Sequence, residues 1–158
     1  MILEIDGAHA NIKFSSTHFI PNHEKCSRLH GHSYIIRARL EGEMDDKGMV
    51  MDFVILKKRL REIADGLDHM ILLPGRSTIV KVEGKGGSYE VTSCDKRYVF
   101  PAEDVVVLDV FTTTAEAMSK MIAEMLAADL EWPSNISSVS IGIDEERGQT
   151  AWYRVNLQ

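Results

Sequence analysis

Three histidines near the N-terminus, His18, His30 and His32, have the clearest chemical potential in the sequence. His30 and His32 are two positions apart, and side chains at i and i+2 of a strand point to the same face, so both can reach one metal ion. His18 precedes them and can supply a third imidazole, the commonest metal ligand among side chains. Three neutral nitrogens with an open fourth position are typical of a catalytic zinc site. The pattern therefore predicts Zn²⁺ as the cofactor.

Cys26 lies four residues before His30 and admits two roles. As a free thiolate it can act on a substrate held near the metal. As a fourth zinc ligand it would close the site and make it structural. A lone cysteine is otherwise most often a small buried hydrophobe, and the residue pattern by itself leaves these readings open.

Acidic residues elsewhere supply further candidates. Asp68 and His69 follow a predicted helix, and a carboxylate beside a histidine can form an acid–base pair. A turn aspartate next to a helix-terminal histidine is an equally good explanation of that pair. Glu145 and Glu146 follow a predicted strand, where most such carboxylates are simply solvated.

Composition restricts the class of protein. The chain has 158 residues, 44% apolar and 27% charged, and is predicted to form one globular domain over 1–158. Its net charge of −6 argues against nonspecific binding to nucleic acid. We expect no membrane span and no signal peptide. Two cysteines, Cys26 and Cys94, cannot build a disulfide framework, so a cytoplasmic location is expected.

Apolar periodicity predicts an alternation of strands and helices. Asp52 is a suitable N-cap for the first helix and Gly66 a suitable stop, and Thr113 or Thr114 can cap the second. The expected helices cover 53–65 and 114–128, and the expected strands cover 2–17, 33–42, 49–52, 136–143 and 150–157. A hairpin with a glycine-rich turn is predicted within 77–93, and a loop is predicted to begin at 144–146.

These motifs, taken in order, resemble one known family. They are Phe-Ser-x-x-His before Cys-x3-His-Gly-His, Gly-x-Val-x-Asp-Phe at 48–53, Leu-Asp-His at 67–69, Thr-x-Glu at 114–116, and Glu145 six residues before Ala-x-Tyr at 151–153. The chain resembles the 6-pyruvoyltetrahydropterin and 6-carboxytetrahydropterin synthases over nearly its whole length. The three-residue gap between Cys26 and His30 is closer to the carboxy branch.

The resemblance implies a fold and an assembly. The fold would be the α+β tunnelling fold (T-fold), with a four-stranded antiparallel sheet, two helices on one face, and an inserted hairpin over 75–104. Chains of this kind would assemble into trimers and then into homohexamers. The Asp–His pair of one subunit would reach the thiol of its neighbour, so the active sites would be shared.

The resemblance also implies residue roles. The metal ligands would be His18, His30 and His32, and the catalytic set would be Cys26, Asp68 and His69. Glu145 would anchor the pterin ring, and Glu116 would lie near the pocket. Glu146 has no counterpart in the motif and is expected to point to the face opposite Glu145.

The implied reaction, in the carboxy branch, converts 7,8-dihydroneopterin triphosphate into 6-carboxytetrahydropterin, releasing acetaldehyde and triphosphate, in 7-deazaguanine (queuosine or archaeosine) biosynthesis. One alternative is 6-pyruvoyltetrahydropterin synthesis, in which triphosphate is eliminated and the side chain is kept. Another is a noncatalytic zinc-containing module that binds a pterin or purine. The sequence departs from the family in an apolar stretch at 70–74 and in a long insertion at 75–104.

Overall fold

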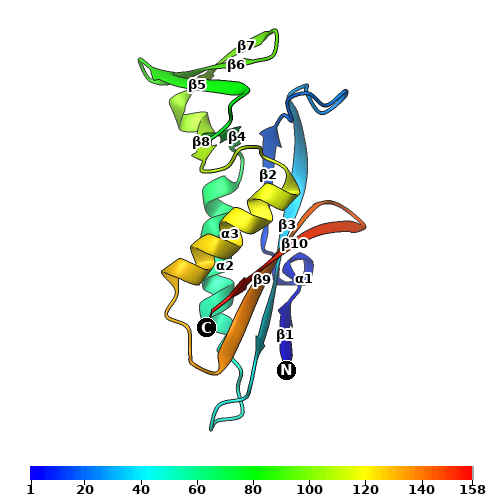
Figure 1. Cartoon of the computed structure of the whole chain (residues 1–158), viewed down its shortest axis with the longest axis vertical. Helices are drawn as coiled ribbons and strands as arrows, with labels where there is room; N and C mark the ends of the chain where they lie inside the picture. The colour runs from blue at the N-terminus through cyan, green and yellow to red at the C-terminus, as the bar shows by residue number, and fades with distance from the viewer. Residues whose placement is uncertain (158) are drawn as a thin grey trace.

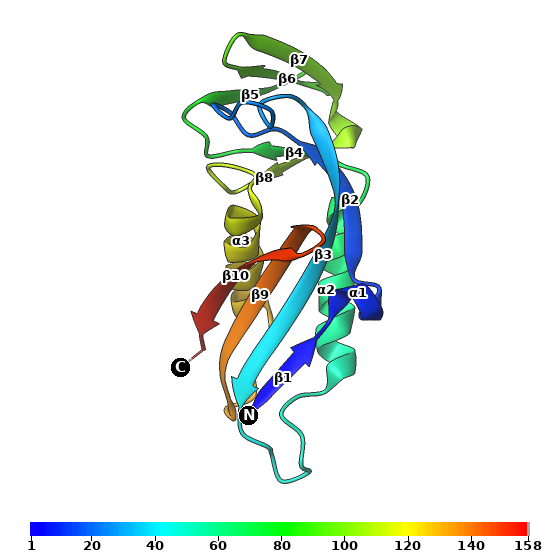
Figure 2. The same ribbon diagram turned by 90° about the vertical axis from the view of Figure 1, so that its right-hand side faces the viewer.

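A seven-stranded sheet covered on one face by two long helices dominates the computed structural model, which describes residues 1–157 (Figures 1 and 2). The strand order is β10-β9-β3-β2-β4-β8, and β1 also pairs with β3. The strands are β1 (Ile2–Ile5), β2 (Lys13–His18), β3 (His30–Gly42), β4 (Ile71–Pro74), β8 (Val105–Leu108), β9 (Ile136–Glu146) and β10 (Gln149–Asn156). The expected α+β class is therefore right, but the expected four-stranded antiparallel sheet is wrong.

The sheet is mixed because two of the strands that follow the first long helix join it in parallel. β4 pairs in parallel with β2, and β8 pairs in parallel with β4. These two strands have only four residues each. A run that short does not establish a strand period, so sequence reasoning missed both.

The segment expected as one strand over 2–17 is two strands separated by a short helix. β1 and β2 pair with successive parts of β3, and α1 (Gly7–Ala10) lies between them. The Asp6 side chain caps α1 by accepting from the Ala8 amide. The long strand β3 thus aligns both pieces.

The first long helix, α2 (Phe53–Leu67), begins where the sequence predicts, because Asp52 accepts a hydrogen bond from the Val54 amide. It continues through Gly66, so the expected stop is one residue too early. Leu56 and Leu60 are buried against the sheet, whereas Phe53 is 48% exposed and does not belong to the apolar face. The expected strand over 49–52 is irregular chain.

The second long helix, α3 (Ala115–Asp129), begins after Thr114, whose side chain accepts from the Ala117 amide. Met118, Ile122 and Leu126 are fully buried. They share the main core with residues of β3 and α2. Both helices therefore cover the same face of the sheet, as predicted, and neither α2 nor α3 is long and apolar enough to cross a membrane.

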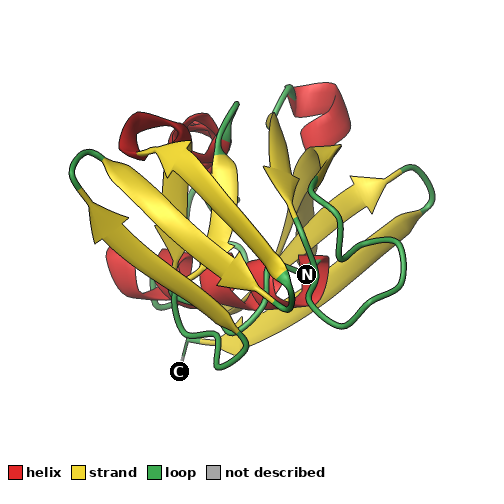
Figure 3. Cartoon of the chain, turned by 90° about the horizontal axis from the view of Figure 1, so that it is seen from above, coloured by secondary structure: helices red, strands yellow, loops and turns green. Residues whose placement is uncertain are grey.

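The insertion over 75–104 forms its own three-stranded sheet at one end of the molecule, nearest the viewer in Figure 3. Its elements are β5 (Val80–Lys85), β6 (Ser88–Ser93), β7 (Lys96–Pro101) and the short 3-10 helix η1 (Ala102–Asp104). The expected hairpin is present, with Gly86 and Gly87 at φ values of 57° and 80° in its turn. Sequence reasoning missed the third strand.

The strand β9 is longer than expected. It continues to Glu146, so residues 144–146 belong to the strand and do not begin a loop. The pairing shifts by one residue between Gln149 and Ala151, which marks an irregularity at the end of the β9–β10 hairpin. Glu145 is therefore presented by regular backbone close to a local distortion.

Candidate metal centre

Strand pairing brings the three histidines together. β2 and β3 are antiparallel, with His18 directly opposite His30 and Ser16 opposite His32. Residues directly opposite in such a pair point to the same face. One ligand atom from each histidine lies within 4.8 Å of those of the other two, so the set could hold a metal ion.

Hydrogen bonds orient two of the three rings. The Nδ1 of His18 lies 2.9 Å from the carbonyl oxygen of Thr113, and the Nδ1 of His30 lies 2.7 Å from that of Arg28. A carbonyl only accepts, so Nδ1 carries the proton and donates in each case. The Nε2 lone pair of both rings is therefore left for a metal, which is the usual second-shell arrangement around a metal-binding histidine.

His32 presents a different kind of evidence. Among the described residues, neither of its buried ring nitrogens has a hydrogen-bond partner. Buried polar atoms without partners are rare because leaving them unsatisfied costs free energy. A metal ion bound to one of the two ring nitrogens would give that nitrogen a partner. Three imidazoles are a donor set that suits zinc. The residues therefore fit the predicted cofactor.

Burial keeps His18 neutral. Desolvation lowers the pKa of His18 from its ordinary 6.5 to about 4. The hydrogen bond to Thr113 raises this pKa, and the charges of His30 and His32 lower it further. His18 is 1% exposed. It is thus unprotonated at neutral pH, as a metal ligand must be.

Glu145 lies at the same centre. Its Oε1 is 3.4 Å from the Nε2 of His18 and 3.9 Å from the Nε2 of His32. The neighbouring Glu146 also reaches the His32 ring, with its Oε1 3.5 Å from Nδ1. We expected the two carboxylates to point to opposite faces, yet each has an oxygen within 4 Å of the His32 ring, Glu145 at Nε2 and Glu146 at Nδ1. Their exposure still differs, at 26% for Glu145 and 70% for Glu146.

Tyr34 is a site residue that sequence reasoning missed. Its hydroxyl donates to Oε1 of Glu145 at 3.4 Å and lies 3.3 Å from the Nε2 of His18. Burial, followed by the negative charge of Glu145, raises the pKa of Tyr34 well above its ordinary value. Tyr34 is therefore a neutral donor beside the histidines. Its position two residues after His32 on the same strand face was the available signal.

An ion-pair network fixes the end of β9 next to Glu145. The Nε of Arg37 lies 2.9 Å from Oδ2 of Asp144, and the hydroxyl of Thr150 donates to Oδ1 of the same carboxylate at 2.6 Å. Arg37 also donates to Asp6 at 2.6 Å. Since successive side chains alternate along a strand, holding Asp144 on one face directs Glu145 to the other.

Two cavities meet at Glu145. A cleft of about 1010 Å³ is lined by His32, Glu145 and Glu146 and extends to His69. A smaller cavity of about 370 Å³ is lined by Glu145 together with Glu116, Thr150 and Trp152. Both volumes are in the range of small-molecule sites. Glu145 and Glu116, which were singled out separately in the sequence, thus line one cavity.

Asp68 and His69 are fastened to the opposite edge of β2. The Ser15 amide donates to Oδ1 of Asp68 at 2.7 Å, and the His69 amide donates to the Ser15 carbonyl at the same distance. The first of these bonds, followed by the His69 contact, lowers the pKa of Asp68. The His69 Nδ1 lies 2.8 Å from Oδ2 of Asp68, and the His69 side chain is 84% exposed.

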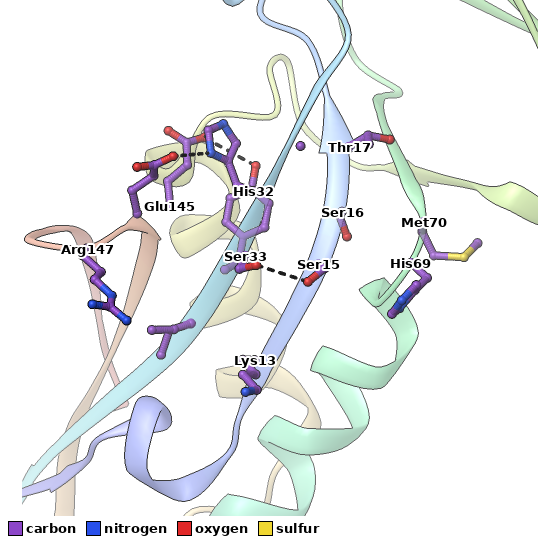
Figure 4. A pocket seen from close by; sticks show the side chains of 14 residues that line it. Lys13, Ser15, Ser16, Thr17, His32, Ser33, His69, Met70, Glu145 and Arg147 are labelled. Atoms are coloured by element: carbon purple, nitrogen blue, oxygen red, sulfur yellow. Dashed lines mark hydrogen bonds and ion pairs between the residues drawn. The ribbon is translucent and has the colours of Figure 1, made fainter.

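The Asp68–His69 pair and the histidine cluster lie on either side of β2, along the cleft that His69 and His32 both line. In Figure 4, His69 lies on the far side of β2 from His32 and Glu145. His69 also has a φ of 60°, a conformation uncommon outside glycine. The fold therefore presents two separate groups of candidate residues, one at each side of β2.

Cys26 lies in the loop between β2 and β3 and is half-buried. Its carbonyl accepts from the Ile20 amide at 2.7 Å, and its amide donates to the Nδ1 of His23 at 3.3 Å. Among residues 1–157, the group of side chains that could hold a metal comprises the three histidines without Cys26. This arrangement favours an open metal site over one closed by the thiol.

Comparisons with known proteins agree with this combination of an α+β fold and a three-histidine centre. The family model described as 6-pyruvoyl tetrahydropterin synthase matches residues 8–156. The chain belongs to this family. A relative in Methanocaldococcus jannaschii, named a putative 6-carboxy-5,6,7,8-tetrahydropterin synthase, is 38% identical over 100% of this chain and 99% of its own length. The 6-carboxy-5,6,7,8-tetrahydropterin synthase of Bacillus subtilis is 31% identical over 64% of this chain and 60% of its own length.

Solved structures show the same fold. The 6-pyruvoyltetrahydropterin synthase of Plasmodium vivax has a TM-score of 0.91 and 26% identity, covering 99% of this chain and 98% of its own. One structure of that enzyme is described as a variant of a catalytic residue that is a glutamate. The sequence-based family assignment is confirmed.

Proposed function

We propose that this chain is a zinc-dependent 6-carboxytetrahydropterin synthase acting on 7,8-dihydroneopterin triphosphate, built as one T-fold unit over 1–158. The observation that carries the proposal is the three-histidine centre with Glu145 beside it, at the meeting point of two cavities. The names of the relatives from Methanocaldococcus and Bacillus support the carboxy branch.

His18, His30 and His32 would hold the zinc through one nitrogen each. Bound there, zinc would act as a Lewis acid toward the hydroxyl groups of the substrate side chain. The carbonyls of Thr113 and Arg28 would keep the His18 and His30 rings in the tautomer that binds metal. The neutral Tyr34 would donate a hydrogen bond at the same place without adding charge.

Glu145 would recognise the pterin ring. A carboxylate can accept two parallel hydrogen bonds from the amidine-like edge of that ring. The cavity of about 370 Å³ that Glu145 shares with Glu116 is of the right order for a bicyclic ligand. This arrangement would put the substrate side chain on the histidine side of Glu145, where the metal would be.

Cys26, Asp68 and His69 would move the protons. The Cys26 thiolate would remove a proton from the substrate side chain. His69 would return one, with Asp68 fixing its orientation through the contact of 2.8 Å. Triphosphate would leave, and cleavage of the side chain, with the uptake of one water molecule, would release acetaldehyde.

The separation of the two residue groups across β2 supports a shared site. Within one chain His69 lies on the other side of β2 from His32, and in this proposal a second copy supplies the Asp68–His69 pair. We therefore include a homo-oligomer, a hexamer made of two trimers, in the proposal. A cytoplasmic location, with no nucleic acid or membrane partner, completes it.

The second candidate function is 6-pyruvoyltetrahydropterin synthesis. Its support is the likeness to the Plasmodium vivax enzyme at a TM-score of 0.91. That enzyme is described with a catalytic glutamate, and here Glu24 lies two residues before Cys26 in the same loop. In the corresponding chemistry here, Glu24 would act as the base and the side chain of the substrate would not be cleaved.

Product analysis distinguishes the candidates. The purified protein is incubated with 7,8-dihydroneopterin triphosphate, and the products are identified by mass spectrometry. We expect 6-carboxytetrahydropterin and acetaldehyde in equal amounts. A 6-pyruvoyl product without acetaldehyde would favour the second candidate, and no release of triphosphate by zinc-loaded protein would contradict both.

A further inference from the structure

The inserted sheet contacts the loop that carries Cys26 at several points. Phe19, the first residue of that loop, is 1% exposed and packs in the small core formed with Val80 and Val91. Its ring stacks on that of Tyr98 in β7, with centroids 5.5 Å apart. The start of the loop is thus anchored by apolar contact with the insertion.

The rest of the loop is held differently. A cavity of about 310 Å³ lies between the loop and the insertion, lined among others by Asn22, His23, Ser27 and Lys96. A cavity of this size means that apolar packing does not fix this part of the chain. Hydrogen bonds within the loop shape this part, as from the Ser27 amide to the His23 carbonyl, and polar contacts across the gap join it to the insertion.

Lys96 makes the shortest contact across this gap. Its Nζ donates to the carbonyl oxygen of Ser27 at 2.8 Å, and Ser27 is the residue directly after Cys26. Lys96 is the first residue of β7, so its backbone is held by a strand. The second contact, from the Sγ of Cys94 to the side chain of Asn22, is 3.5 Å long and involves a weak thiol donor.

We propose that the insertion is the support of the thiol loop, and that Lys96 is a positioning residue for Cys26. The ammonium group of Lys96 fixes the peptide between Ser27 and Arg28, while the bond from the Ile20 amide fixes the peptide between Cys26 and Ser27. Together they determine where the thiol points. The catalytic consequence of this inference rests on the proposed role of Cys26, but the structural consequence does not.

The structural arm of the test uses hydrogen–deuterium exchange on the full chain without substrate. Lys96→Ala should raise amide exchange across residues 20–28 roughly tenfold, because a charged hydrogen bond that holds the segment is lost. Lys96→Arg should restore protection, since guanidinium can also donate to the carbonyl. Lys81→Ala, an exposed lysine on β5 of the same sheet, is the matched control and should leave exchange unchanged.

The thiol itself gives a second readout. In a Cys94→Ser background, the rate of alkylation of Cys26 by iodoacetamide should change at least about threefold in Lys96→Ala and remain unchanged in Lys81→Ala. Zinc content should stay at the wild-type level, since His18 and His30 lie in strands outside the loop. Loss of zinc from Lys96→Ala would overturn the proposal, because Lys96 would then support the metal centre.

The catalytic arm is read separately. With a protein that turns over the pterin substrate, Lys96→Ala should lower kcat roughly tenfold to a hundredfold with little change in KM, and Lys96→Arg should recover most of it. Unchanged loop exchange and unchanged alkylation in Lys96→Ala would refute the inference. Changed exchange in a protein without turnover would keep the inference and contradict the proposed function alone.

Discussion

His18 and His30 lie directly opposite each other on β2 and β3, with ring centroids 4.7 Å apart. His32 follows two residues later on the same face, so the centre is built from one cross-strand pair and one neighbour along the strand. The backbone pairing of two strands, and no flexible loop, thus sets the spacing of the three rings.

The first prediction is one zinc per chain. His30→Ala and His32→Ala should each lower zinc affinity roughly a hundredfold or more, because each removes one of three ligands. His9→Ala, an exposed histidine outside the cluster, should retain stoichiometric metal. Elemental analysis after dialysis measures the ratio, and full zinc content in both cluster variants would exclude this centre.

The second prediction separates the metal from the thiol. Cys26→Ala should retain zinc and lose turnover, because the thiol lies outside the three-histidine set and is needed for proton transfer. Cys94→Ser, in the insertion, should change kcat little. Glu24→Gln removes the carboxylate base that the second candidate function would use, and it is the control for that base in the same loop. Loss of zinc from Cys26→Ala would instead support a closed structural site.

The third prediction concerns pterin binding by Glu145. Glu145→Gln should weaken binding by roughly 2 to 5 kcal/mol, or at least about tenfold, because the ring's buried N–H groups lose a charged acceptor. Glu146→Gln should change binding less, since Glu146 is 70% exposed. Fluorescence titration with a pterin measures both. Equal affinity of wild type and Glu145→Gln would remove Glu145 from the site.

The fourth prediction is a pH dependence of the stability of the metal-free protein. The pKa of His18 is about 4 in the folded chain against 6.5 for the free side chain. Between these values the unfolded chain binds more protons, so stability falls as the pH falls from about 6.5 to 4, by up to about 3 kcal/mol. Denaturant unfolding at several pH values measures this slope. A His18→Gln variant should have a shallower slope than wild type, and identical slopes would contradict the assignment.

The fifth prediction tests shared sites. Cys26→Ala and His69→Ala should each be inactive alone. Equal amounts assembled together should regain roughly a quarter of wild-type activity, because random neighbours combine one intact Cys26 with one intact His69 in that fraction of interfaces. Coexpression followed by activity measurement tests this, with separately purified variants mixed after assembly as the control. No recovery in coexpressed protein would mean that the sites are not shared.

Local patterns were sufficient for part of this structure. The i, i+2 spacing of His30 and His32 and the caps at Asp52 and Thr114 depend on neighbours in sequence, and the structure has them as predicted. The pairing of His18 with His30 depends on strand register, which the sequence suggests only by proximity.

Long-range contacts account for most of what sequence reasoning missed. The parallel strand β4 follows α2 and pairs with β2, and β8 follows the insertion and pairs with β4, so each depends on a partner that is distant in the sequence. Tyr34 was missed because its closeness to Glu145 depends on the pairing of β3 with β9. The contact of Glu146 with Nδ1 of His32 is one that alternation along a regular strand does not anticipate.

The position of β2 has a consequence for assembly. This strand carries His18 on one face and fastens Asp68 and His69 at its edge, so in the proposed shared arrangement every chain offers two unlike halves of a centre. In an open row of such chains, the chain at each end always has one half of a centre with no neighbour to complete it. A closed ring matches every half, so that the number of complete centres equals the number of chains. Closure of the ring, and not association alone, would then determine how much of the protein is active.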